Sequence, residues 1–565
     1  MADDELAVLR WTTAYIGAGS PLSQKAMNFI QGQQAACSQH HTACVKPASK
    51  SQPTRLLDLG LDQSATGAVL ITPSADEDPI QYCVLSHCWG GTRSNFLVKS
   101  NHESFRTYIE PEDIPKTFRD TFLVAKALGI RFIWIDALCI IQDSREDWEN
   151  EASRLLDYFE NSVLNIVAAA SGSSQDGFLT EVVTSDMYEH KLVDAVQKGM
   201  EIPRREWHHA LHLRPQTYYR DRDYPLYGRA WAFQELLLSP RVLALQSDSI
   251  VWSCNELTTF DTGNTRLSEF WQFMTSVRRQ LATGKNTESS LCGLWLSIIE
   301  FYSQLQVSLS SDRLVAISGV AKRVARLVKL RYVAGLWRED MVRGLLWAAS
   351  KVRDARAAQR PRRLPAYIAP TWSWASIDCQ VIFDIPWAAS EQSRVQIVAD
   401  VLDIQLLYPS STPYSGVSDG WVLLRASVMD PNRFFEMAGD TYVLALDDET
   451  EGDSLQGVLF LPCLKLEIDS KSEKQEHLIG LLVRPLDVEK TRAQASSAAI
   501  AASPSVKAAG LPSFAGDNVG VSSNLALRQD EEEHSYRRIG RLSGITKTME
   551  VASVRWNEAA TLKII

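Results

Sequence analysis

The chain has 565 residues, of which 45% are hydrophobic and 22% are charged, a composition typical of a folded protein of about two to four domains. Its formal net charge of −10 leaves no basic excess for contacts with phosphate, which argues against a general nucleic-acid binder. Nine cysteines are too few for a disulfide scaffold of this length, so a reducing compartment is favoured. The unusual figure is 16 tryptophans, which serve either packing or chemistry.

The start of the chain and its hydropathy give no sign of export or of membrane insertion. Residues 1–6 are acidic at three positions and precede no apolar segment of the kind that signal peptides carry. No stretch approaches the roughly 20 apolar residues that a membrane helix needs. We therefore expect a soluble, cytoplasmic protein without a membrane span.

Residues 1–79 are predicted to form a helical segment that carries a cluster of cysteine and histidine. Cys37, His40, His41 and Cys44 lie within eight residues and are of the types that bind zinc. No second pair of ligands at a distance is evident to close a tetrahedral site. A helix end with small buried thiols is therefore the favoured interpretation, no metal ligand is assigned, and metal binding by the four residues stays an open alternative.

Strand-like and helix-like segments alternate between residues 80 and 255. The predicted elements are a strand over 82–86, a helix over 114–128, a strand over 131–136, a helix from about 143, a strand over 163–168, a helix over 229–238 and a hairpin over 241–254. In the helix from 143, Trp148 lies on the apolar side, whereas Asp143, Asp147 and Glu151 share another side, which is expected to face water. The alternation predicts βαβ units with a parallel sheet covered by helices. Polar residues near 180–224 are expected to be an insertion.

The rest of the chain is predicted to consist of a helical region, a basic linker and a β-rich domain. Residues 256–350 are helical in pattern and end in a long amphipathic piece around Leu345 to Trp347. A basic linker is predicted over 351–367, followed by a β-rich C-terminal domain over 368–565. Residues 493–524 are rich in Ala, Ser, Gly and Pro and are expected to be a disordered insertion in that domain.

The first candidate site is the run Ser86, His87, Cys88, Trp89 and Gly90, which follows the first predicted strand. Ligands of open parallel sheets bind outside the carboxyl ends of the strands. The run is either a binding loop or a turn kept for conformational reasons. A catalytic pair of His87 and Cys88 is disfavoured, because adjacent side chains of an extended chain point in alternating directions.

Two carboxylates, those of Asp136 and Glu235, are further candidates for the functional site. Asp136 interrupts an apolar strand near its carboxyl end, so it either bonds to the following loop or faces a cleft. Glu235 is the only acid in the apolar helix 229–238, and Trp231 lies on the same face. A carboxylate beside an indole is one way to tune an acid for bond cleavage at an anomeric carbon. From spacing alone the favoured alternative is a structural Glu235, paired with an arginine such as Arg229 or solvated.

Four motifs in order resemble the fungal heterokaryon-incompatibility (HET) domain. They are Tyr82-Cys-Val-Leu-Ser-His-Cys-Trp-Gly90, Ile114-Pro-Lys-Thr-Phe-Arg-Asp120, Gly129-Ile-Arg-Phe-Ile-Trp-Ile-Asp-Ala-Leu-Cys-Ile-Ile-Gln-Asp143 with Trp148, and Arg229-Ala-Trp-Ala-Phe-Gln-Glu235. The resemblance covers roughly residues 80–255. His87 occupies a position where many members have tyrosine.

The resemblance implies an α/β fold distantly similar to TIR domains: a parallel sheet with flanking helices, here followed by the helical region and the β-rich domain. In TIR domains a strand ending in Ser leads to a ligand loop, and a Trp…Glu helix supplies the carboxylate that cleaves nicotinamide from NAD. Glu235 is then the expected catalytic residue, and NAD the expected substrate, with no bound cofactor. The residues expected to contact the ligand are Ser86, His87, Cys88, Trp89, Gly90, Asp136, Arg229 and Trp231. Among them, Asp136 could hold ribose hydroxyls, and Trp89 or Trp231 could stack on a base.

The resemblance also implies a role in fungal non-self recognition and programmed cell death, triggered by self-association. The activating partner cannot be named from the sequence. Two alternatives remain open: a non-enzymatic signalling module that recruits partners, and a tailoring enzyme that acts on a small molecule in the same cleft.

Overall fold

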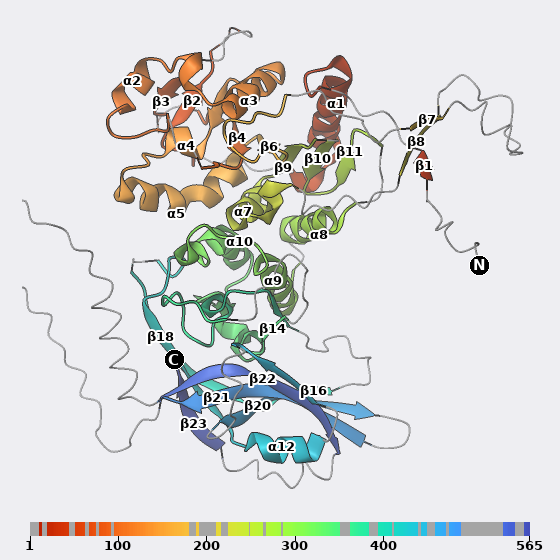
Figure 1. Cartoon of the computed structure of the whole chain (residues 1–565), viewed down its shortest axis with the longest axis vertical. Coiled ribbons are helices and arrows are strands. Elements are labelled where there is room, and N and C mark those ends of the chain that lie inside the picture. Colours follow the sequence, from red (N-terminus) through yellow and green to blue (C-terminus); the bar gives the residue numbers. More distant parts are fainter. Residues whose placement is uncertain are drawn as a thin grey trace, which may run out of the picture. The chain divides into compact units, whose positions relative to one another are not determined.

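The computed structural model of the chain divides into two compact units, residues 1–332 and 333–565, which are described separately (Figure 1). The residues described are 11–13, 20–44, 51–60, 62, 67–74, 78–91, 95–179, 188–190, 211–215, 224–247, 249–263, 267–283, 286–350, 362–383, 394–409, 412–438, 442–448, 458–469, 474–486, 535–547 and 559–565. Within them, no helix is both long enough and apolar enough to cross a bilayer.

The first unit is built on an eight-stranded sheet in the order β11-β10-β9-β6-β4-β5-β2-β3. The strands are β2 Leu56–Asp58, β3 Val69–Ile71, β4 Tyr82–Ser86, β5 Phe132–Trp134, β6 Leu164–Ala168, β9 Arg241–Leu245, β10 Ile250–Cys254 and β11 Thr258–Phe260. The pairs β5–β4, β4–β6 and β6–β9 are parallel, and the flanking pairs are antiparallel. In chain order the four parallel strands therefore lie 2-1-3-4, and the topological switch point falls between β4 and β6.

Helices cover both faces of this sheet, and the predicted α/β class is confirmed. All residues of β4 and β6 are buried, as expected for strands covered on both faces. The connecting helices are α3 Lys116–Ala127, α4 Asp136–Cys139, α5 Arg145–Asn161 and α7 Ala230–Leu238. Because parallel crossovers are right-handed, α3 and α5, which leave β4 and β5 in opposite directions, lie on opposite faces (Figure 1). The strand predicted over 131–136 is shorter, since Asp136 already begins α4.

The prediction that Glu151 faces water is wrong. Glu151 is fully buried and accepts hydrogen bonds from the Thr54 hydroxyl at 2.5 Å and the Tyr158 hydroxyl at 3.0 Å. Arg55 donates to Asp147 at 2.6 Å and lies 3.8 Å from Glu151. The polar side of α5 is thus covered by the segment that leads into β2. Helical periodicity could not reveal this partner, which lies about a hundred residues earlier.

The remaining elements of the first unit lie before, between and after the strands of this sheet in the chain. They are β1 Trp11–Thr13, α1 Gln24–His40, η1 Thr42–Cys44, α2 His102–Thr107, η2 Pro111–Asp113, β7 Tyr188–His190, β8 Leu211–Pro215, η5 Pro225–Gly228, α8 Glu269–Thr283, α9 Glu288–Tyr302, η6 Ser310–Asp312, η7 Val315–Ile317 and α10 Ser318–Leu327. Strands β1, β8 and β7 form a small sheet, and most of the predicted insertion around them lies outside the described residues. The helical pattern after residue 256 is confirmed by α8, α9 and α10.

The second unit contains the predicted β-rich region. β12 Tyr332–Val333 includes the last residue of the first unit and the first of the second. The short elements that follow it are β13 Leu336–Trp337, η8 Arg338–Asp340, α11 Met341–Gly344, β14 Ala348–Ala349, η9 Trp374–Ser376 and β15 Val381–Ile382. The long amphipathic helix expected here is therefore a single turn. A second sheet follows with the order β16-β20-β21-β22-β23-β18-β17, and β19 pairs with β22. Its elements are β16 Arg394–Ile397, β17 Asp400–Leu407, β18 Asp419–Ser427, α12 Pro431–Ala438, β19 Tyr442–Leu446, β20 Leu459–Asp469, β21 Lys474–Pro485, β22 Ser535–Lys547 and β23 Ala559–Ile564.

A buried ion pair lies in the core of the second unit. Arg538 is fully buried, with its Nε 3.0 Å from Asp447 Oδ2 and its guanidinium 3.3 Å from the centre of the Trp347 ring. Such pairing is what makes a buried cation tolerable. Most of the expected linker and the whole of the expected insertion over 493–524 lie outside the described residues.

Candidate functional site

The candidate residues gather where β4 and β6 end, at the switch point of the sheet. β4 ends at Ser86, which pairs with Val167 near the end of β6. Asp136 begins α4 after β5, and Arg229 is the residue directly before α7. Electrostatic interactions connect Asp136, Arg229 and Ser86 to Glu235 of α7. Residues as far apart in the sequence as Ser86 and Glu235 therefore form one site.

The carboxyl of Glu235 has a raised pKa. Glu235 is half-buried, and desolvation raises the pKa of its carboxyl to about 7, assisted by the nearby negative charge of Asp136. The Ser86 hydroxyl and the Arg229 guanidinium act in the opposite direction. Ser86 is fully buried, and its Oγ has no hydrogen bond of ordinary geometry within the described residues. The Ser86 hydroxyl and the Glu235 carboxyl therefore lie close together, and no partner of ordinary geometry within the described residues uses the Ser86 hydroxyl.

Arg229 does not form the ion pair with Glu235 that a structural role would favour. Its Nη1 donates instead to the backbone carbonyl of His87 at 2.6 Å, and no ion pair of Glu235 occurs in the part of the chain that is described. Burial raises the pKa of the neighbouring Cys88 thiol, although Arg229 lowers it in part. Cys88 is thus kept protonated, and Arg229 anchors the loop rather than neutralising the acid.

His87 is a buried, neutral histidine. Its ring packs edge-on against Phe118, with the ring centres 4.8 Å apart. Desolvation lowers the pKa of His87 to about 4, and the charge of Asp136, 3.9 Å from Nδ1, compensates only in part. Neutral His87 beside a protonated thiol gives no activated nucleophile.

Asp136 bonds to the residue that follows it, which is one of the two alternatives that the sequence left open. One carboxylate oxygen accepts from the backbone N–H of Ala137 at 2.7 Å, and the other accepts from the Trp89 indole at 2.8 Å. The side chain nevertheless remains 28% exposed. The indole of Trp89 in turn packs edge-on against Phe96, with ring centres 5.2 Å apart. Asp136 is therefore fixed in orientation while part of it still faces solvent.

The loop after β6 holds the Trp89–Gly90 turn in place. The backbone N–H and the hydroxyl of Ser174 donate to the carbonyl of Trp89 at 3.3 and 2.9 Å. Gly90 has φ +74°, and a Cβ at this position would lie 2.4 Å from Ser173 Cβ. Only glycine permits both this conformation and this approach. This loop is not among the predicted site residues, although its run Ser-Gly-Ser-Ser-Gln-Asp-Gly after a parallel strand is a sequence signal for a site.

Trp231 makes contacts that the sequence did not indicate. Its indole N–H donates to Asp312 of η6 at 3.3 Å, and its ring packs edge-on against Trp148 with the centres 6.5 Å apart. Trp148, expected on the apolar side of α5, is 37% exposed. Trp148, Trp231 and Asp312 form a second cluster on elements adjoining the site.

A family model described as heterokaryon incompatibility protein (HET) matches residues 82–235. Residues 82–235 are a HET domain. The HET domain begins at the first residue of β4 and extends to Glu235 inside α7, so it contains every candidate residue between Ser86 and Trp231. No curated protein and no solved structure matches the chain.

The match supports a role of the heterokaryon-incompatibility type for this chain. The HET domain itself supplies three of the parallel strands, β4, β5 and β6, together with α3, α5 and most of α7. The α1 segment and strands β9, β10 and β11 lie outside the match but complete the same unit.

Proposed function

We propose that the HET domain acts in non-self recognition and cell death by cleaving the nicotinamide–ribose bond of NAD, with Glu235 as the catalytic residue. The observation that carries the proposal is the carboxyl of Glu235, which has a pKa near 7, no ion pair in the described structure, and a place at the switch point of the sheet. Ligands of doubly wound sheets bind at this point.

The reaction suits a carboxylate in this position. The C1′–N bond breaks, nicotinamide leaves with the bonding electron pair, and positive charge develops on the ribose. An ionised Glu235 stabilises that charge while water adds to C1′ and gives up a proton, so the products are nicotinamide, ADP-ribose and H⁺. Nicotinamide leaves as a neutral molecule, and no acid is required to protonate it. The active form of Glu235 is therefore the carboxylate.

The neighbouring residues have roles that fit this chemistry. The exposed part of Asp136 can accept hydrogen bonds from ribose hydroxyls, because its orientation is fixed by Trp89 and by the backbone of Ala137. The buried hydroxyl of Ser86 can donate to the carboxylate of Glu235 or to the substrate. Arg229 holds the carbonyl of His87 and thus the start of the ligand loop.

The proposal includes activation by self-association in the cytoplasm, through a partner that the sequence does not name. NAD loss in cells tests it most simply. The full chain is expressed with a fused domain that forces oligomerisation, and cellular NAD is compared for the wild type, Glu235→Gln and Glu149→Gln. Glu149 is an exposed acid of α5 that, among the described residues, forms an ion pair with Arg145 alone, so it is a matched control.

The wild type and Glu149→Gln should deplete NAD, whereas Glu235→Gln should lose activity by at least about 100-fold, the usual size of a missing catalytic group. Equal depletion by the wild type and Glu235→Gln contradicts the role of Glu235. No depletion by any of the three contradicts the enzymatic proposal and favours a signalling module without catalysis.

A further inference from the structure

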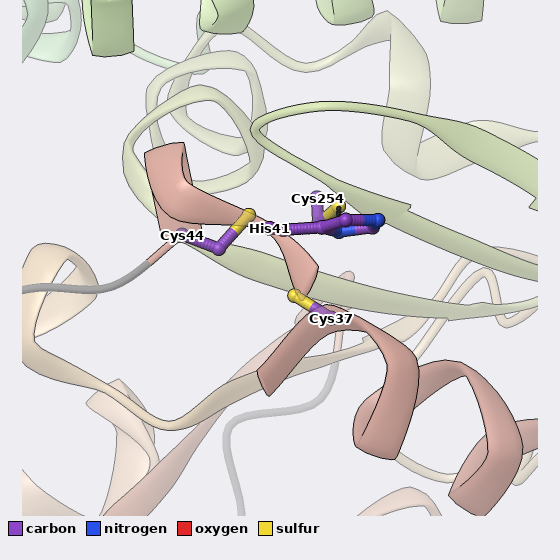
Figure 2. A group of neighbouring side chains, drawn as sticks. All are labelled: Cys37, His41, Cys44 and Cys254. Atoms are coloured by element: carbon purple, nitrogen blue, oxygen red, sulfur yellow. Dashed lines mark hydrogen bonds between the residues drawn. The ribbon is translucent and has the colours of Figure 1, made fainter. Parts of the chain in front are cut away.

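Four potential metal ligands converge at one end of the sheet of the first unit. Figure 2 shows Cys37, His41, Cys44 and Cys254 with their side chains directed toward one another. Their ligand atoms, three sulfurs and one imidazole nitrogen, all lie within 4.8 Å of one another. The three cysteines are buried and His41 is half-buried. This cluster lies outside the HET match and shares no residue with the candidate site above.

The fold provides the distant ligand that the sequence lacked. Cys37 lies in the last turn of α1, His41 caps this helix, and Cys44 ends η1. Cys254 is the last residue of β10 and comes 213 residues after His41. His40 is exposed and does not belong to the cluster. Because Cys254 lies on a different element, the four ligands can surround one ion rather than lie along one helix.

The geometry is that of a closed tetrahedral site. Zinc–sulfur bonds of about 2.3 Å place the sulfurs of a tetrahedral site roughly 3.8 Å apart. The Cys254 sulfur already lies 3.3 Å from His41 Nδ1, and the widest pair of ligand atoms would need to approach by about 1 Å. A set of three cysteines and one histidine is a standard structural zinc set, with no open position for a substrate.

Groups around the cluster support the ligands and balance their charge. Arg241 Nε donates to the Cys37 sulfur at 3.3 Å, and Asn255 Nδ2 donates to the carbonyl of Ala43 at 2.9 Å. Glu256 accepts from the backbone N–H of Ala43 at 2.9 Å. Three thiolates with one Zn²⁺ carry a net charge of −1, which the guanidinium of Arg241 offsets. Such outer contacts are typical of metal sites, because they orient the ligands.

We propose that Cys37, His41, Cys44 and Cys254 bind one structural Zn²⁺, which ties α1 to the hairpin of β9 and β10. Zinc would then fix the segment before the HET domain to the strands after it. The inference is independent of any catalytic activity, since it rests on a separate group of residues.

Metal analysis of the purified full-length chain tests the proposal. The protein is produced in zinc-supplemented medium, purified without chelators, and its zinc is measured by mass spectrometry. About one zinc per chain is expected in the wild type, and substitution of a ligand should lower it to about a tenth or less. The ligand variants are His41→Ala and Cys254→Ser. The matched controls are His40→Ala, at the exposed neighbour, and Cys83→Ser, at a buried cysteine of β4, and both should keep the metal.

A second measurement covers the case in which the ligand variants fail to fold. Titration of the wild-type thiols with a mercurial reagent should release zinc in proportion to the cysteines modified. Purified wild type that is free of zinc and does not take it up, or that holds a disulfide within the cluster, overturns the proposal. Equal loss of zinc in His40→Ala and His41→Ala overturns the assignment of ligands.

Discussion

At the residue scale, Glu235 is placed where its charged form is disfavoured. Its pKa of about 7 in the folded chain lies above the ordinary value of 4.5, so folding loses stability as pH rises from 4.5 through 7. Glu235→Gln should therefore stabilise the chain by on the order of 2 kcal/mol at pH 8 and change it little at pH 4.5. Urea unfolding at both pH values measures this, and destabilisation at pH 8 would contradict the placement.

The same pKa predicts the pH dependence of the proposed reaction. Since the carboxylate is the active form, kcat/KM should rise with pH through about 7 and then level off. Nicotinamide release measured between pH 5.5 and 8.5 provides the profile. A rate that falls across pH 7 would instead indicate that Glu235 acts as an acid.

His87 predicts an opposite effect of pH on stability. Its pKa falls from the ordinary 6.5 to about 4 on folding, so its neutral form contributes stability above pH 6.5 that is lost as pH falls toward 4. His87→Phe preserves the edge-on packing against Phe118 and removes this titration. At pH 4 the variant should be more stable than the wild type by up to about 3 kcal/mol, with a smaller difference at pH 8. Chemical unfolding at the two pH values checks it, and an equal difference at both would refute the titration.

At the scale of elements, the ligand loop depends on the close contact between Gly90 and Ser173. Gly90→Ala adds a Cβ 2.4 Å from Ser173 Cβ and forces alanine into positive φ. We expect a loss of about 2 kcal/mol and weaker protection of the loop from hydrogen exchange. Gly91→Ala is the control, because a Cβ there meets nothing within 4 Å. Equal effects of the two substitutions would contradict the account of the turn.

The helices and strands also show how much of the fold can be predicted from the sequence. Buried strands such as β4 and β6 and the helix α7 follow from local apolar patterns and from Ser239-Pro240, which ends α7, so they were predictable. The burial and contacts of a residue could not be predicted where they depend on partners far away in the sequence. Glu151 is buried because Arg55 and Thr54 cover it, and Cys254 joins the cysteine cluster through the sheet. For the site, the motifs indicated Ser86, Asp136 and Glu235, but the contact of Arg229 with the His87 carbonyl required the fold.

At the scale of the whole molecule, the two units have separate cores. One surrounds the sheet of β4 and β6, and the other includes Phe434, Phe460 and Leu542. Calorimetry should therefore show two unfolding transitions. If the proposed zinc is bound, its removal by a chelator should lower only the transition of residues 1–332, by several degrees, because the metal binds the folded form of that unit. An equal shift of both transitions would contradict the separation of the units or the location of the metal.

The most direct test of the central claim is nicotinamide release by the purified full-length chain, self-associated through a fused domain and given NAD at pH 8. The wild type should form nicotinamide and ADP-ribose in equal amounts. Glu235→Gln, folded and at least as stable, should form neither above background. Turnover by Glu235→Gln at the wild-type rate, or none by the wild type, would contradict the claim that Glu235 catalyses this cleavage.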